Sequence, residues 1–176
     1  TKNEHAEQLH QMEKIAKSVQ SMLSAATEDS ALISTSLYMD NSLQDFVSRQ
    51  YASPQDYFSS YREYIHNSLL QGVSRITNSV IRVYADNETL INGSEFARLS
   101  TVSQEPWYQQ YTADGYSPRL LFSYDETDGR QVLFLRGMNG LYSNKAECLL
   151  CIGINYSTLD RDFQNMGSVS YTHLTL

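Results

Sequence analysis

The chain is poor in cysteine, with only Cys148 and Cys151 among its 176 residues. A C-x-x-C spacing can serve zinc or redox chemistry. Here the pair lies inside the apolar run 148–154, which is typical of a buried strand. Side chains three positions apart on a strand point to opposite faces, so the two thiols should not share a metal or form a disulfide. We predict two small core residues, no metal site and no cofactor.

Long apolar runs and clusters of basic residues are also missing. No stretch approaches the roughly 20 apolar residues that cross a bilayer. Thr1–Glu4 is polar and has no initiator Met, so we see no signal peptide and expect a piece of a longer protein. The formal net charge is −7 and no run of Lys and Arg occurs. This excludes nucleic acid as an expected partner, because phosphate binding needs a basic patch.

Catalytic motifs are absent as well. The sequence has four histidines, and none belongs to a recognisable Ser-His-Asp or Cys-His set. Phosphate-loop glycines are missing too. We therefore predict no catalytic residues and expect that the chain is not an enzyme in itself.

The first 51 residues contain neither Pro nor Gly and predict a long helix. About 38 residues would span roughly 57 Å, more than the diameter of a small domain. A heptad-like apolar stripe follows this segment: Leu9, Met12, Ile15, Val19, Met22, Ala26 and Ile33. Two interpretations stay open: the stripe packs on a second copy of the same helix, or it packs only on its own domain.

Further helices and five strands are expected after this segment. Asn41 can cap a short helix over 43–47, and Ser53 followed by Pro54 begins a helix whose apolar face runs from Tyr57 to Val73. The expected strands are 80–84, 89–91, 120–124, 131–136 and 147–155. Short helices are expected at 95–102 and 106–111, and a closing helix from Ser157 to Phe163.

This order predicts an α+β fold: a long N-terminal helix, then a PAS-like domain with a central five-stranded antiparallel sheet flanked by helices. The turn at Asp128-Gly129 favours an antiparallel hairpin between the third and fourth strands. Two strands, short helices and then three strands is the order of a PAS-like domain.

Four segments resemble one family in sequence and in order: 36–46 (SLYMDNSLQDF), 81–87 (IRVYADN), 105–108 (EPWY) and 151–159 (CIGINYSTL). Together they resemble the extracellular Cache (PAS-like, dCache) region of YesM-type bacterial sensor histidine kinases, over roughly residues 8–166. The resemblance implies a membrane-anchored homodimer on the extracellular face of the cell membrane. Transmembrane helices would flank the sensing region, and a cytoplasmic kinase would follow it. Related Cache regions occur in chemoreceptors, and a ligand-free dimerisation or protein-interaction module is a further alternative.

We expect the chain to divide into three parts. Residues 1–50 would be a helical stalk with a short helix, and residues 51–166 the membrane-distal PAS-like domain. Residues 167–176 read like a translated sequencing adapter, so we expect native sequence to end near Gly167 or Ser168.

A Cache domain binds a small molecule between its sheet and its short helices. The candidate ligand-binding residues are Tyr84, Trp107, Tyr108, Phe122, Tyr124, Asp125 and Arg136. Three of them have a second interpretation: Arg136 as an anion anchor or a strand-end Arg reaching solvent, Trp107 as a ligand contact or core, and Asp125 as an amine anchor or a turn residue. Glu105 stands where the amino-acid-binding branch carries Arg, which argues against an amino acid. A sugar, an organic acid or an amine remains open.

Overall fold

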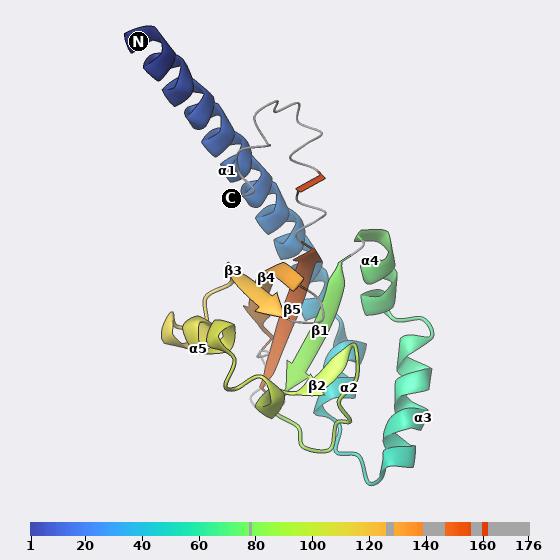
Figure 1. The fold of residues 1–176 in the computed structure, drawn as a ribbon. Helices are drawn as coiled ribbons and strands as arrows, with labels where there is room; N and C mark the ends of the chain where they lie inside the picture. Colours follow the sequence, from blue (N-terminus) through green and yellow to red (C-terminus); the bar gives the residue numbers. More distant parts are fainter. Residues whose placement is uncertain (78, 126–128, 139–146, 156–159, 162–176) are drawn as a thin grey trace.

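The computed structural model describes residues 1–77, 79–125, 129–138, 147–155 and 160–161, with the backbone alone at 125, 129, 130 and 155. Its centre is a five-stranded sheet in the order β2-β1-β5-β4-β3 (Figure 1). The strands are β1 (Val80–Ala85), β2 (Phe96–Arg98), β3 (Arg119–Asp125), β4 (Gly129–Gly137) and β5 (Cys148–Asn155). The α+β class and the hairpin of β3 with β4 are confirmed.

Some of the helices begin where a local side chain caps them. They are α1 (Lys2–Tyr38), α2 (Asn41–Ser48), α3 (Pro54–Ile65), α4 (Leu69–Thr77), the 3-10 helix η1 (Leu99–Thr101) and α5 (Pro106–Ala113). Ser53 caps α3 as expected, with its Oγ accepting from the Asp56 N–H at 3.1 Å. The cap of α2 is Asp40, one residue before the predicted Asn41.

The prediction of a purely antiparallel sheet is wrong at one edge, where β2 pairs with β1 in parallel from Val83↔Phe96 onward. The predicted strand 89–91 is a turn, because the Asn87 side chain holds the chain there. Its Nδ2 donates to the carbonyls of Val47 and Arg49 at 2.9 and 2.8 Å. The apolar residues of this turn serve the core instead, with Leu90 buried. The second strand forms at Phe96–Arg98 instead. The segment 95–102, which was predicted to be a helix, therefore contains β2 followed by η1.

The prediction of a single helix from Tyr57 to Val73 is also wrong, because residues 66–68 are not helical and separate α3 from α4. The Ser68 hydroxyl accepts from the Gln71 N–H at 3.1 Å and so caps a new helix. Phe58 and Leu69, both expected on the apolar face, are almost half exposed.

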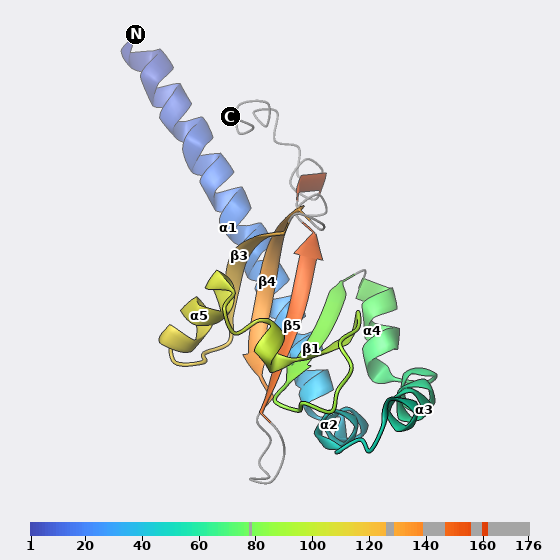
Figure 2. The same ribbon diagram turned by 60° about the horizontal axis from the view of Figure 1, so that its bottom comes forward.

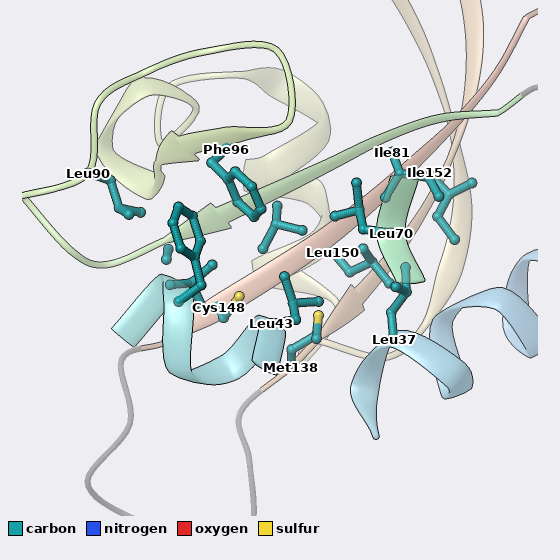
Figure 3. Close-up of a cluster of buried hydrophobic side chains, with 14 of the residues drawn as sticks. Leu37, Leu43, Leu70, Ile81, Leu90, Phe96, Met138, Cys148, Leu150 and Ile152 are labelled. Atoms are coloured by element: carbon teal, nitrogen blue, oxygen red, sulfur yellow. The ribbon is translucent and has the colours of Figure 1, made fainter. Parts of the chain in front are cut away.

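Two apolar clusters cover the two faces of the sheet. On one face the end of α1, α2 and α4 pack through Leu37, Leu43 and Leu70 onto β1 and β5 (Figure 3). On the other face η1 and α5 pack onto β3, β4 and β5. Figure 2 shows α1 and α5 on opposite sides of the sheet. Cys148 belongs to the first cluster and Cys151 to the second, which confirms their opposite orientation.

Helix α1 is confirmed as one continuous element, and its N-terminal part extends beyond the sheet (Figure 1). Its first buried residue is Ser30, whereas Leu9 and Met12 are 48% and 64% exposed. Near the domain several hydroxyls bond back to the helix: Thr27 to the Leu23 carbonyl at 2.7 Å and Ser36 to the Leu32 carbonyl at 3.2 Å. No described helix has the length and apolar character to cross a membrane. Of the predicted closing helix from Ser157 to Phe163, only residues 160 and 161 are among the described residues. The tail 167–176 lies wholly outside them.

Candidate functional site

Three of the predicted ligand-binding residues lie together on the α5 face of the sheet. The ring centroids of Tyr84 and Trp107 are 6.1 Å apart, and Trp107 meets Tyr108 edge-on at 6.1 Å. Trp107 is the second residue of α5, directly after Pro106, and the helix places its indole against Tyr84 of β1. Burial raises the pKa of both Tyr84 and Tyr108. The arrangement is an aromatic layer between sheet and helix.

The space under α5 is filled rather than open. A cavity of about 30 Å³ remains between α5 and the sheet, whereas small-molecule pockets measure roughly 300–1,000 Å³. Tyr111 closes it: its hydroxyl donates to the Tyr116 carbonyl at 2.9 Å and accepts from the Gly137 N–H at 2.8 Å. Tyr116 itself has a φ of 62°, a left-handed conformation that few side chains adopt. This one cavity has room for no more than a water-sized guest.

Arg136 lies on the opposite face, where it anchors α1. Its Nη1 donates to the hydroxyls of Ser34 and Thr35 at 3.0 and 2.9 Å, and its Cζ lies 5.0 Å from the ring centre of Tyr38. The two hydroxyls in turn donate to the Ala31 carbonyl at 2.8 and 2.9 Å. The guanidinium is therefore engaged by the helix in a way that neither sequence interpretation included.

The other predicted residues do not join Trp107 either. Phe122 and Tyr124 of β3 share the face of Arg136 through the register Phe122↔Val132, and they are 70% and 71% exposed. Asp125 pairs with Gly129 through its backbone, and its side chain lies outside the described part of the chain. The six predicted residues whose side chains are described thus divide between two faces of the sheet, with Tyr84, Trp107 and Tyr108 on one face and Phe122, Tyr124 and Arg136 on the other.

The anchoring role of Arg136 can be tested by Arg136→Met, which keeps the aliphatic stem and removes the donors. We expect the free energy of unfolding to fall by about 1–2 kcal/mol, because two charge-assisted hydrogen bonds and a cation–π contact are lost at a half-buried site. Urea titration measures it, with the exposed Arg75→Met as the matched control. Equal effects of both variants would contradict the anchor.

A larger cleft lies elsewhere, between the end of α1 and helices α2, α3 and α4. Its volume is about 690 Å³, within the range of small-molecule sites. The lining combines carboxylates, one guanidinium and aromatic rings: Asp40, Asp45, Glu63, Arg49, Phe46, Tyr51 and Tyr64. The sequence did not indicate this cleft, because its residues come from four helices and the segments between them and form no motif.

The tyrosines that line this cleft differ in how their hydroxyls are satisfied. Tyr51 donates to the Phe46 carbonyl at 2.6 Å. The hydroxyl of Tyr64 is buried and has no hydrogen-bond partner among the described residues. Burial raises the pKa of Tyr51 to about 12 and that of Tyr64 further, with Asp40 adding to the effect on Tyr64. A buried hydroxyl without a partner is costly in a folded protein.

Comparison with known proteins gives no family for this chain. No protein-family model matches it, and no curated protein matches it. Functional inference therefore rests on the fold, the cleft and the long helix.

Proposed function

We propose that this chain is the extracellular ligand-sensing region of a bacterial transmembrane sensor histidine kinase, with a PAS-like Cache fold and no catalytic step of its own. The element order supports the proposal: β1 and β2, then η1 and α5, then β3 to β5. The four segments that resemble the YesM-type family support it from the sequence side.

The observation that carries the proposal is the continuity of α1. One helix of 37 residues begins outside the domain and ends in its core, where Leu37 is fully buried. A helix transmits displacement along its axis because its backbone hydrogen bonds hold it as one rod. Arg136 of β4 donates hydrogen bonds to the same helix at the hydroxyls of Ser34 and Thr35. A rearrangement of the domain therefore acts directly on the rod.

In this proposal two copies pair through the stripe on the projecting part of α1, and the membrane lies beyond its N-terminus. An apolar groove along α1 is lined by residues of that stripe, among them Met12, Ile15 and Val19. A bound ligand would favour one of two arrangements of the helix pair, and that bias is the signal.

The pairing predicts that Val19→Glu weakens self-association of the chain by at least about 100-fold, since each copy loses a buried Val and gains a charge. Ser21→Glu introduces the same residue on the opposite, exposed side of the helix and should leave association unchanged. Sedimentation equilibrium measures both dissociation constants. A chain that stays monomeric up to about 1 mM, the order of concentration that tethering provides, would defeat the pairing.

A second candidate is a ligand-free dimerisation or protein-interaction module. The filled space under α5 favours it, because that is where the family resemblance expects a ligand. Thermal shifts with sugars, organic acids and amines separate the two candidates. A ligand at 100 times its Kd adds about 2.7 kcal/mol of stability, whereas a ligand-free module gives no shift with any of them.

A further inference from the structure

The loop that follows α5 begins with an ordinary helix ending. Gly115 has a φ of 82°, a left-handed conformation that glycine adopts without strain. Its N–H donates to the Thr112 carbonyl at 3.1 Å. The next N–H, that of Tyr116, donates to the Tyr111 carbonyl at 3.2 Å. These two bonds are those of a Schellman motif, which explains why a glycine stands at this position.

The motif does not explain the backbone of Tyr116. Its φ of 62° is the one positive value outside glycine in the described part of the chain. Such outliers persist only where surrounding contacts hold them, and they cluster in segments that switch. Tyr111 supplies the contacts here. Its hydroxyl donates to the Tyr116 carbonyl at 2.9 Å, and the two rings meet edge-on with centroids 5.8 Å apart.

Tyr111 also holds the end of β4. Strand β3 begins at Arg119 opposite Leu135, so Gly137 lies two residues beyond the last pair of this ladder. The Tyr111 hydroxyl takes the place of the missing strand and accepts from the Gly137 N–H at 2.8 Å. A Cβ on Gly137 would lie 3.4 Å from the same oxygen. One phenol therefore joins the strained loop after α5 to β4.

The residue before Gly137 is Arg136, whose side chain lies on the other face of the sheet. There it donates to the hydroxyls of Ser34 and Thr35 in α1. Two adjacent residues of β4 thus hold one helix on each face, α5 through Tyr111 and α1 through the guanidinium. Side chains alternate between the faces of a strand while the backbone is common to both. A shift of β4 at this end therefore moves both contacts.

We propose that Tyr111, Tyr116 and Gly137 form a clasp with two positions, which couples α5 to α1 across the sheet. In the closed position of this structure, Tyr116 is left-handed and Tyr111 bonds to both partners. In the open position Tyr116 relaxes to a negative φ, Tyr111 releases Gly137, and the end of β4 shifts with Arg136. Strain in Tyr116 favours opening and the two hydrogen bonds oppose it, so the clasp responds to a modest change in contacts.

The clasp deepens the proposed function by giving it a means of regulation. It rests on that function only for the use of the coupling as a signal. Any contact on the α5 side that pulls the loop open or keeps it closed would act on α1 through Arg136. The coupling itself belongs to the fold and is measurable without a ligand.

The hydrogen-exchange rate of the Gly137 amide in the full chain tests the two positions. Tyr116→Val should raise this rate at least about tenfold, because a β-branched residue rarely adopts a positive φ and the clasp opens. Tyr116→Gly also removes the ring but adopts a positive φ without strain, so its rate should stay within about threefold of the wild type. Ile152 in the central strand should exchange as before in both variants.

Two results of the exchange experiment would overturn the clasp. One is a Gly137 rate that rises equally in Tyr116→Val and Tyr116→Gly, or in neither, because the left-handed backbone would then play no part. The other is an equal rise at Gly137 and Ile152, which would show that the loop only contributes to the stability of the whole fold.

A double-mutant cycle tests the coupling to α1. Tyr111→Phe keeps the ring and removes the hydroxyl, and Arg136→Met removes the contact with α1. Loss of either contact already loosens this end of β4. The combined effect on the unfolding equilibrium constant in urea should therefore be smaller than the product of the single effects by about fivefold or more.

Tyr108→Phe is the matched control for this cycle. Tyr108 lines the same small cavity from the same helix, and no hydrogen bond joins its hydroxyl to the described part of β4. Its effect should multiply with that of Arg136→Met within about twofold, as expected for independent sites. A Tyr111 cycle that also multiplies within about twofold would overturn the coupling.

The clasp and the sensor proposal can fail separately. Independent effects in a chain that still associates through Val19 would remove the clasp and leave the sensor. Coupled effects in a chain that stays monomeric would keep the clasp as a property of the fold and count against the dimeric sensor.

Discussion

Phe46→Ala is expected to lower the free energy of unfolding by about 3–5 kcal/mol. Phe46 is the centre of the aromatic cluster that joins α2 to α3 and β2. Its ring lies within 4.7–6.3 Å of five other rings, those of Tyr51, Tyr57, Tyr61, Tyr64 and Phe96. Removing it leaves a cavity that these neighbours cannot all fill. Since domains are stable by only about 5–15 kcal/mol, the variant approaches unfolding.

Urea titration with a linear fit measures this loss, and an unchanged slope shows that the compactness of both states is kept. Phe58→Ala is the control on the adjacent helix, because Phe58 is 45% exposed and meets only Tyr57 among the described rings. Its expected loss is below about 1 kcal/mol. A similar loss in both variants would contradict the central role of Phe46.

Stability should also fall steeply above about pH 9, with the two cysteines as the cause. Burial raises the pKa of both Cys148 and Cys151 from 9.0 to about 12. Above pH 9 the unfolded chain releases both thiol protons while the folded chain keeps them. The unfolded state then binds fewer protons, so the free energy of unfolding falls by about 2.7 kcal/mol per pH unit, twice the value for one group. Below pH 9 this stabilisation is fully present.

The measurement is urea unfolding at intervals from about pH 7 to about pH 11. Tyr51 adds to the loss only above pH 10, because its pKa is raised from 10.0 to about 12. The double variant Cys148→Ala, Cys151→Ala should therefore start at lower stability but stay level until about pH 10. A wild-type profile that is flat between pH 9 and pH 10 would show that the thiols titrate normally.

The sequence was a good guide wherever structure follows from local chemistry. The absence of Pro and Gly predicted one long N-terminal helix, and Ser53 with Pro54 predicted the start of α3. The apolar runs of β1, β3, β4 and β5 were each long enough to identify a strand. Alternation along β5 placed its two cysteines on opposite faces.

The failures concern pairs of residues that are far apart in the chain. Residues 89–91 and 96–98 are both short apolar segments, and the contact of Asn87 with α2 decides between them. Arg136 and Ser34 are 102 positions apart, so nothing local indicates that the guanidinium serves α1. The packing of Trp107 on the other face of the sheet is also a long-range contact, so the sequence did not show that Trp107 and Arg136 lie apart.

The hydroxyls of Ser34 and Thr35 have a mechanical consequence. Both donate to the Ala31 carbonyl, which already accepts within the helix, and similar bonds are made by Thr27, two turns earlier, and by the adjacent Ser36. Such bonds compete with the backbone ladder and make a helix easier to bend. These bonds therefore make α1 easier to bend at 27–36, where it enters the domain, while the backbone hydrogen bonds keep its outer segment straight. Motion of the domain would then tilt the outer segment of α1 about this point and displace its N-terminal end.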